Sequence, residues 1–575
     1  MLEKMRPKIL KNIKNGPGSV GRHSWTLWAA SSLSAVLLEL PFPLTGPMLP
    51  WRSVFAWFAL VPLLWALLAS NADEHHAIRR GFLLGYLCGV LWYCGNCYWV
   101  RNTMERYGNM PALTPTLLLI GFSLVLGLYF GLFGLFVTLV RRRSGKVWLA
   151  LATAPFIWVA LDLAAARITS VPWDQLGYLQ VDNQLVTRLV LWTGVYGITF
   201  LLVAVNALIV AGLTVTRLRD RIVSLAAGAL LLLAGWAGML VQPLKAETTA
   251  TAVLIQPNLN VGGVGYWTGP GEWDAHMAEF VRLAEEKCKG YIEGIPQTGA
   301  VPGEVVCPPY ATHPDLVVWP ESPAPFFEQD ARFKVAMSAI AQTVHAPVIV
   351  NGIGSDPDQA ADDTFDHVSA MVFGADGKEI GRYDKIHLVP FGEFVPFPKL
   401  LFFARKLTGM VSKFRPGTER RVFLLNGHRY GVFICYEAVF ADEVRQFTKM
   451  GAEVLVNISD DGWYGDTSAP WQHLNMARMR AIENRRWLLR GTNNGVTASI
   501  DPYGRVQQSI LRHQTDALPA LFGFCSDVTF YSAHGDVFAW ACAILAIGIL
   551  GSVNMVPSFS RPIRASSMAG ENPSK

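Results

Sequence analysis

Cys435 is the residue of this sequence whose surroundings most favour nucleophilic chemistry. It follows the apolar, β-favouring run Val432–Ile434 and precedes Tyr436 and Glu437, after which the pattern becomes helical. A cysteine on the tight turn between a buried strand and a helix can project its thiol from the sheet edge, beside free backbone N–H groups. A lone cysteine after a strand is more often a small buried core residue, so a catalytic role needs support from other residues.

Two further residues just past predicted strands supply the other groups that nucleophilic catalysis needs. Glu321 follows the apolar stretch 315–319, and Lys385 follows a strand that begins after a turn at Gly377. The ends of neighbouring strands meet at one edge of a sheet, so a carboxylate, an ammonium group and a thiol can converge there. Taken singly, a Glu or Lys after a strand is more often a solvated loop residue.

Together, the three positions and their contexts resemble the Glu-Lys-Cys triad of the nitrilase superfamily. The contexts are WPES at Glu321, YDKIHLVPFGEFVP at Lys385 and CYE at Cys435. Within that superfamily, the phrases HLVPFGEFVPF, NISDDGWYGD and HLNMARMRAIENRRWLLRGTNNG resemble the apolipoprotein N-acyltransferases. With the hydrophobic flanks, this resemblance covers most of the chain.

The resemblance implies a two-step acyl transfer. A fatty acyl chain passes from a phospholipid to a thioester on Cys435, and then to the α-amino group of the diacylglyceryl-modified cysteine at a lipoprotein's N-terminus. Glu321 is the implied base, and Lys385 binds the oxyanion together with the backbone N–H of Tyr436. Two further residues resemble those that support the triad in the family: Glu393 and Glu437. We expect no metal or other cofactor. The alternative is a membrane-anchored nitrilase-type amidase that uses water as the acceptor.

Aromatic residues are the candidates for substrate binding. The family has a functional tryptophan after a Gln-x-Asn stretch like residues 256–258, and we predict Trp273 for this role in preference to Trp267. Trp463 and Tyr464 lie just past a predicted strand and can line the acyl pocket.

Composition indicates a membrane protein that carries a soluble part. Of the 575 residues, 51% are hydrophobic and only 16% are charged, against roughly 25% charged residues in a typical soluble protein. The mean hydropathy is +0.28. The net charge of +5 is small for this length, and the basic residues gather at the ends of apolar runs, so nucleic acid is not an expected partner.

Eight apolar runs are long enough to cross a bilayer core of roughly 30 Å. They are 24–42, 51–69, 80–100, 114–140, 147–167, 188–215, 222–242 and 535–556. Basic loops at 78–80, 141–146 and 216–221 fall on the side of the Lys- and Arg-rich tail 1–23, which the positive-inside rule places in the cytoplasm. We therefore predict a multi-pass protein of the bacterial inner (cytoplasmic) membrane whose residues after about 243 are periplasmic.

The expected domains follow from these runs. They are a cytoplasmic tail (1–23), a seven-helix transmembrane domain (24–244), a periplasmic nitrilase-like catalytic domain (245–530), and an eighth transmembrane helix with a cytoplasmic tail (531–575). In the catalytic domain, predicted strands alternate with helices near 273–290, 328–345, 439–450 and 469–487, which is typical of a layered α/β domain. The resemblance implies an αββα sandwich, whereas the pattern alone also permits a doubly wound sheet. We expect a monomer in contact with the bilayer, with phospholipids and diacylglyceryl-modified apolipoproteins as partners.

Three segments leave open questions. Residues 291–314 are rich in Pro and Gly and predict a surface insertion. Cys288 and Cys307 either form a disulfide that braces this insertion or remain free thiols. Cys88, Cys94 and Cys97 include a C-x-x-C pair with no nearby His, which favours helix packing over metal binding. The aromatic and basic stretch 394–417 predicts a lid at the membrane surface, with a core-packed helix as the alternative.

Overall fold

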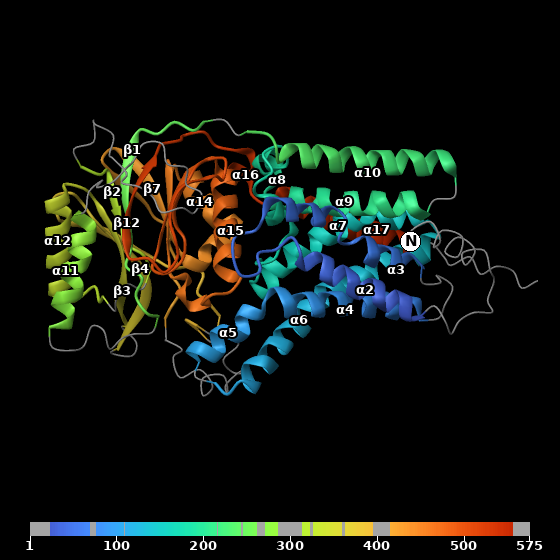
Figure 1. Ribbon diagram of the computed structural model, residues 1–575, viewed down its shortest axis with the longest axis horizontal. Coiled ribbons are helices and arrows are strands. Elements are labelled where there is room, and N and C mark those ends of the chain that lie inside the picture. Colours follow the sequence, from blue (N-terminus) through green and yellow to red (C-terminus); the bar gives the residue numbers. More distant parts are fainter. Residues whose placement is uncertain are drawn as a thin grey trace, which may run out of the picture.

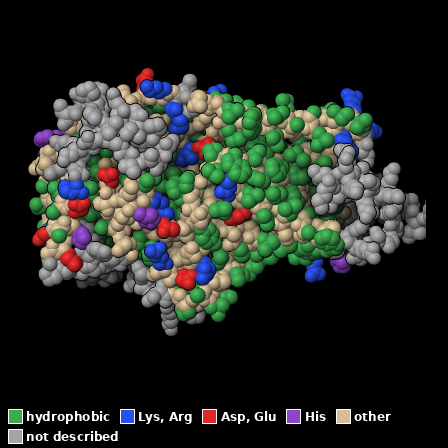
Figure 2. Space-filling view, viewed as in Figure 1, with side chains coloured by type: hydrophobic (Ala, Val, Ile, Leu, Met, Phe, Trp, Pro, Cys, Tyr) green, Lys and Arg blue, Asp and Glu red, His purple; other side chains and the backbone are tan. Residues whose placement is uncertain are grey.

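The computed structural model places an α-helical bundle beside a layered α/β domain (Figure 1). It describes residues 24–69, 76–108, 110–214, 217–242, 245–261, 271–285, 313–321, 326–358, 363–390, 392–394 and 414–555. Hydrophobic side chains cover most of the visible face of the bundle, whereas charged side chains are scattered over the α/β half (Figure 2). The predicted division into an apolar helical part and an α/β part is therefore confirmed.

The bundle consists of helices from both ends of the chain. They are α2 (Ser24–Glu39), η1 (Pro50–Trp57), α3 (Val61–Ala69), α4 (Ala77–Asn96), α5 (Tyr98–Tyr107), α6 (Leu113–Ser144), α7 (Val147–Ala164), η2 (Ala165–Thr169), η3 (Leu176–Gln180), η4 (Val186–Leu189), α8 (Val190–Thr193), α9 (Val195–Thr214), α10 (Leu218–Gly238), α16 (Phe530–His534) and α17 (Val537–Met555). By length and composition, five described helical segments can cross a membrane: 50–69, 113–144, 147–169, 195–214 and 218–238. The total of eight crossings stays a prediction.

Glycines allow two of the long helices to approach closely. A Cβ on Gly85 of α4 would lie 2.1 Å from the carbonyl oxygen of Phe130, and one on Gly134 of α6 would lie 2.2 Å from that of Gly81. Small residues at such crossings bring helix backbones together where lipid provides no hydrophobic driving force between helices. The sixth predicted span is interrupted at Gly194, whose φ of 61° ends α8 before α9 begins.

The α/β domain is an αββα sandwich of two six-stranded sheets. The first has the order β12-β1-β2-β3-β4-β5 and the second β11-β10-β9-β8-β7-β6. The strands are β1 (Ala250–Gln256), β2 (Leu316–Val318), β3 (Val348–Asp358), β4 (Asp363–Phe373), β5 (Glu379–Asp384), β6 (Val422–Leu425), β7 (His428–Ile434), β8 (Val454–Ser459), β9 (Trp487–Thr492), β10 (Thr497–Ile500), β11 (Val506–Ile510) and β12 (Asp516–Phe522). The sandwich implied by the resemblance is confirmed over the doubly wound alternative.

Two helix layers enclose the sheets. An apolar core lies between α11 (Glu272–Glu285), α12 (Ala331–Val344) and the first sheet, and a second core lies between the two sheets. The helices α14 (Ala441–Lys449) and α15 (Ala469–Asn484) lie on the bundle side of the second sheet (Figure 1). Strands β1–β3 and β7–β9 run parallel within their sheets, so their carboxyl ends form a common edge on which a site can be built.

Part of the predicted secondary structure was wrong near the end of the domain. The helix predicted for 469–487 ends at Asn484, because Arg485 takes a left-handed conformation with φ 51°. The chain then forms β9, which is buried along its whole length. Strands β11 and β12 were not predicted. β12 runs antiparallel to β1, and this places Phe522 opposite Ala250.

Helix α15 joins the two parts of the molecule. Gln472 accepts a hydrogen bond from the Trp173 indole (2.7 Å), and Glu483 accepts one from the backbone N–H of Val195 (2.9 Å). Both acceptor side chains are buried. Because a buried polar group left unpaired costs about 1–3 kcal/mol, these contacts favour one fixed placement of the α/β domain on the bundle.

Candidate active site

Cys435 occupies a strained turn at the end of β7. The preceding residue, Ile434, is extended, whereas Cys435 has φ 48° and begins the short helix η6 (Cys435–Val439). The left-handed conformation costs a residue with a Cβ about 1–2 kcal/mol, and such strain gathers at functional sites. The side chain is only 5% exposed. The predicted strand-to-helix turn at Cys435 is therefore present.

Lys385 brings together two of the predicted carboxylates. Its Nζ lies 3.0 Å from Glu321 Oε1 and 2.7 Å from Glu393 Oε1. The Lys385 side chain has no exposed surface. The second carboxylate oxygen of Glu321 accepts from the backbone N–H of Asp460 (3.0 Å), and that of Glu393 accepts from Val389 (2.7 Å). Every polar end of this trio is thus held in place by a neighbour.

Burial and the neighbouring charges shift the pKa values of Lys385 and Cys435 upward. Burial alone would lower the pKa of Lys385, but the carboxylates of Glu321 and Glu393 outweigh it and hold the pKa well above its usual value. Burial and the nearby Glu321 raise the pKa of Cys435, although Lys385 and a hydrogen bond with Ser459 oppose this shift. A resting thiol with a raised pKa needs a base to become the thiolate nucleophile.

Glu437 ties the loop of Lys385 to the turn of Cys435. Its Oε1 accepts from the Tyr383 hydroxyl (2.8 Å) and from the backbone N–H groups of Ile386 (2.7 Å) and His387 (3.1 Å). Its Oε2 accepts from Ile434 N–H at 2.7 Å. The Glu437 carboxylate therefore holds backbone N–H groups on both sides of the site. Its supporting role in catalysis stays a prediction.

Replacing Glu437 with glutamine should lower the free energy of unfolding by about 1–3 kcal/mol. The NH₂ group of the glutamine would face a backbone N–H that donates to the carboxylate in the parent, so one hydrogen bond would be lost. The rate of any reaction at Cys435 should fall at least tenfold, since a loosened turn misplaces the thiol. Thermal unfolding and turnover of E437Q would be compared with those of E453Q, whose carboxylate also accepts a backbone N–H but is partly exposed. Equal stability and activity in E437Q and the parent would contradict this assignment.

A second buried polar cluster lies directly behind Cys435, and it was not predicted. The Asp461 carboxylate lies 2.7 Å from Arg490 Nη2 and 2.9 Å from His473 Nδ1, and the three side chains have no exposed surface. The Ser459 hydroxyl donates to Asp461 at 2.9 Å. The signal in the sequence was the polar pair after an apolar strand in NISDD, which is unusual at a strand end that is to be buried.

This cluster predicts an acid-sensitive contribution to stability. Burial alone would raise the pKa of Asp461, but Arg490 and His473 more than offset it and hold the pKa below its usual value. A carboxylate with a depressed pKa stabilises the fold above its unfolded pKa, roughly 3.9, and this contribution is lost as the pH falls further. The difference in unfolding midpoint between the parent and D461N should be constant above about pH 4 and should shrink below it. An unchanged difference at pH 2.5 would contradict the expectation.

The predicted aromatic residues lie in two places. Tyr464 is buried, with its ring centroid 5.2 Å from that of Trp99 in the bundle, and the ring of Trp463 lies 5.3 Å from that of Tyr107. Both therefore lie where the α/β domain meets the bundle. Trp273 lies at the start of α11 with the Arg332 guanidinium 4.9 Å from its ring. Substrate binding by these three residues stays a prediction.

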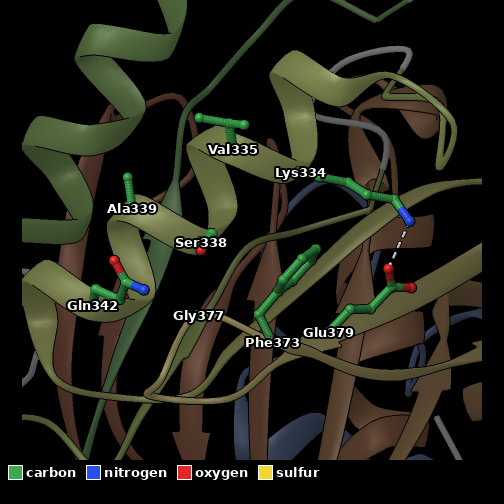
Figure 3. Close-up of a pocket in the computed structure, with 8 residues that line it drawn as sticks. All are labelled: Lys334, Val335, Ser338, Ala339, Gln342, Phe373, Gly377 and Glu379. Atoms are coloured by element: carbon green, nitrogen blue, oxygen red, sulfur yellow. Dashed lines mark hydrogen bonds and ion pairs between the residues drawn. The ribbon is translucent and has the colours of Figure 1, made fainter.

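Two other features of the α/β domain do not belong to the triad. A groove is lined by α12 and by the segment from the end of β4 to the start of β5, with an ion pair between Lys334 and Glu379 at its rim (Figure 3). Asp356, His367 and Asp384 are close enough to hold a metal ion, but Arg382 already pairs with both carboxylates, at 2.5 and 3.1 Å.

Several predictions fall wholly or largely outside the described residues. These are the insertion 291–314, the pairing of Cys288 with Cys307, the choice against Trp267, and most of the proposed lid 394–417. Of the C-x-x-C pair, Cys97 is buried and its thiol donates to Asp174 at 3.1 Å, which links α4 to the loop before η3.

Comparison with known proteins agrees with the resemblance. The family model "Apolipoprotein N-acyltransferase N-terminal domain" matches residues 34–208, and "Carbon-nitrogen hydrolase" matches residues 286–516. An apolipoprotein N-acyltransferase of Geobacter metallireducens is 32% identical over 520 residues, which cover 89% of this chain and 92% of that protein. The chain belongs to the apolipoprotein N-acyltransferase family.

Other apolipoprotein N-acyltransferases are similar over much of their length. The enzyme of Vibrio cholerae is 30% identical over 78% of this chain and 83% of its own. Among solved structures, an amidase from Nesterenkonia sp. aligns with 52% of this chain and 98% of its own at 14% identity, with a TM-score of 0.33. As a member of the apolipoprotein N-acyltransferase family with several apolar helices, the protein is a membrane protein.

Proposed function

We propose that the protein transfers a fatty acyl chain from a phospholipid to the α-amino group of the N-terminal diacylglyceryl-cysteine of lipoproteins. The observation that supports this proposal is the position of the turn at Cys435 against the bundle. Tyr436, the residue after Cys435, donates its hydroxyl hydrogen bond to Ser170 of the bundle (2.8 Å) and stacks on Trp173. The nucleophile therefore lies against the apolar bundle, where two lipid substrates can reach it from the bilayer.

In the first step, Glu321 accepts the proton of the Cys435 thiol as the sulfur attacks the ester carbonyl of the phospholipid. The tetrahedral oxyanion is stabilised by the Lys385 ammonium group and the Tyr436 N–H. The C–O bond then breaks, and the leaving alkoxide takes the proton from Glu321. The products are a thioester on Cys435 and a lysophospholipid.

In the second step, the acceptor amine attacks the thioester. An α-amino group has a pKa of roughly 7.7–8.0, so a usable fraction is neutral near pH 7. Glu321 accepts the proton that the amine loses, the same donors hold the second oxyanion, and the C–S bond breaks. The proton of Glu321 returns to the departing sulfur, which gives the amide and the free thiol. Glu393 holds Lys385 throughout.

The proposed placement in the cell follows from the loops of the bundle. The tail 1–23 and the tail after the eighth span face the cytoplasm, residues 24–244 form seven membrane spans, and residues 245–530 form the catalytic domain in the periplasm. The supporting feature is the run of arginines 141–143 at the end of α6. The lipoprotein substrate would meet the enzyme on the periplasmic side.

A mass spectrum tests the proposed chemistry. After incubation with phospholipid and no acceptor, the protein should gain one acyl group on Cys435, and hydroxylamine should remove it. Addition of a diacylated lipopeptide should discharge the thioester to an N-acyl amide. An unmodified Cys435 in folded protein would overturn the phospholipid as donor, and release of free fatty acid alone would favour the amidase alternative.

A further inference from the structure

The ring of His473 donates a hydrogen bond to the backbone carbonyl of Cys435. Its Nε2 lies 3.0 Å from that oxygen, and the ring is fully buried. A carbonyl oxygen only accepts hydrogen bonds, so Nε2 must carry a proton. The contact therefore assigns His473 as a donor to the peptide that links Cys435 to Tyr436.

The other ring nitrogen is held in a way that preserves this donor. Nδ1 lies 2.9 Å from the Asp461 carboxylate and 3.1 Å from Arg490 Nη2. If Nδ1 carries a proton, it donates to Asp461; if it does not, it accepts from Arg490. A neutral ring protonated on Nδ1 alone would leave Nε2 and the Cys435 carbonyl as two facing acceptors. The ring is therefore either protonated on both nitrogens or protonated on Nε2, and Nε2 donates in both states.

Aromatic rings fix the plane of the imidazole. The indole of Trp173 stacks on His473 with a centroid distance of 5.6 Å and an interplanar angle of 25°, and Tyr464 contacts it edge-on at 6.3 Å. Trp173 belongs to the bundle, whereas His473 belongs to α15. The direction of the Nε2–H bond is thus set jointly by the two parts of the molecule.

We propose that His473 is a positioning residue that strengthens the Tyr436 N–H as an oxyanion donor. This role rests on the proposed function, in which that N–H binds the oxyanion. The Cys435 carbonyl and the Tyr436 N–H belong to one peptide unit, so a hydrogen bond to the oxygen polarises the unit and makes its N–H a better donor. The same bond holds the strained turn that presents the thiol.

The expected decrease in the rate of thioester formation follows from two magnitudes. Loss of one oxyanion donor lowers the rate by roughly a hundred- to a thousandfold. A hydrogen bond in a chain of hydrogen bonds is strengthened by roughly a tenth to a third through its neighbours, so removal of the His473 contact should slow thioester formation about two- to tenfold. The fraction of molecules that react should not change.

The test compares His473→Leu with His473→Gln. Single-turnover acylation with saturating phospholipid gives the rate constant and the amplitude, and the infrared band of the thioester carbonyl reports the strength of its hydrogen bonds. H473L should react about two- to tenfold more slowly at full amplitude, with the band at higher wavenumber. H473Q, whose amide can donate to the same carbonyl, should recover both values. His428→Leu, at the opposite end of β7, is the matched control.

Several outcomes would overturn the proposal. They are an unchanged rate and band in H473L, a reduced amplitude with an unchanged rate, or H473Q behaving like H473L. If H473L does not fold, the unsubstituted protein still provides a test: in ¹⁵N-histidine spectra, Nε2 of His473 must be protonated throughout pH 6–9, and a bare nitrogen would overturn the assignment. Absence of any thioester in the parent would instead contradict the proposed function.

Discussion

Replacing Cys435 with alanine should abolish acyl transfer and leave the fold intact. Removal of a covalent nucleophile typically lowers the rate by about 10⁴- to 10⁶-fold, because the remaining groups cannot form the intermediate. Alanine fits the same turn with the same φ of 48°, so the unfolding temperature should change little. Mass spectrometry should show no acyl adduct on C435A after incubation with phospholipid.

Two companion variants sharpen this result. C435S should retain at most a trace of activity, since a serine hydroxyl is much harder to ionise than a thiol. C525A is the control, because Cys525 is a partly buried cysteine of the same domain that lies outside the triad. Transfer by C435A near the parent rate would exclude the thioester mechanism, whereas loss of activity in C525A would show that the domain is generally sensitive to substitution.

Replacing Lys385 with methionine should have the second largest effect, on both rate and stability. Loss of one oxyanion donor lowers the rate by roughly a hundred- to a thousandfold. The substitution also leaves the carboxylates of Glu321 and Glu393 buried without their common cation, and breaking a buried ion pair in this way costs about 3–5 kcal/mol. Acylation rates and thermal unfolding of K385M measure the two effects separately.

The pH dependence of K385M gives an independent check. Burial already raises the pKa of Glu393 in the parent, with Lys385 opposing that shift, so removal of Lys385 raises it further. A carboxyl group with a raised folded pKa stabilises the fold below its unfolded pKa of roughly 4.3, and this contribution is lost as the pH rises through the folded value. K385M should therefore lose more stability relative to the parent at pH 8 than at pH 5. The opposite trend would contradict the charge assignment.

Much of the site could be predicted from local sequence patterns, because its residues lie just past predicted strands. Cys435 and Lys385 directly follow β7 and β5, and Glu321 lies three residues after β2, so all three are near the carboxyl-end edge of the sandwich. The contacts of Glu437 could not be predicted, since a carboxylate that accepts four hydrogen bonds resembles any surface Glu in sequence.

The features that could not be predicted depend on contacts between residues that are far apart in the sequence. Strand β12 pairs with β1 across more than half of the domain, and no local pattern encodes such a partner. The sequence predicts only a helix around His473, because the contacts of this residue with Asp461 and Cys435 arise only when α15 packs behind β7. The burial of Arg480 and Arg490 could not be predicted either, since it depends on the buried carboxylates of Glu483 and Asp461 with which they pair.

The pairing of β1 with β12 also bears on how such a protein can be assembled from separate units. The chain enters the α/β domain at Ala250 and leaves it near Phe522, which is the direct partner of Ala250 in the sheet. A unit whose two ends are adjacent can be inserted into a loop of another protein without disturbing either fold. The segment between α10 and α16 therefore enters and leaves the α/β domain at one place, and a chimera could exchange that domain at these two points provided that the contacts of Gln472 and Glu483 with the bundle are kept.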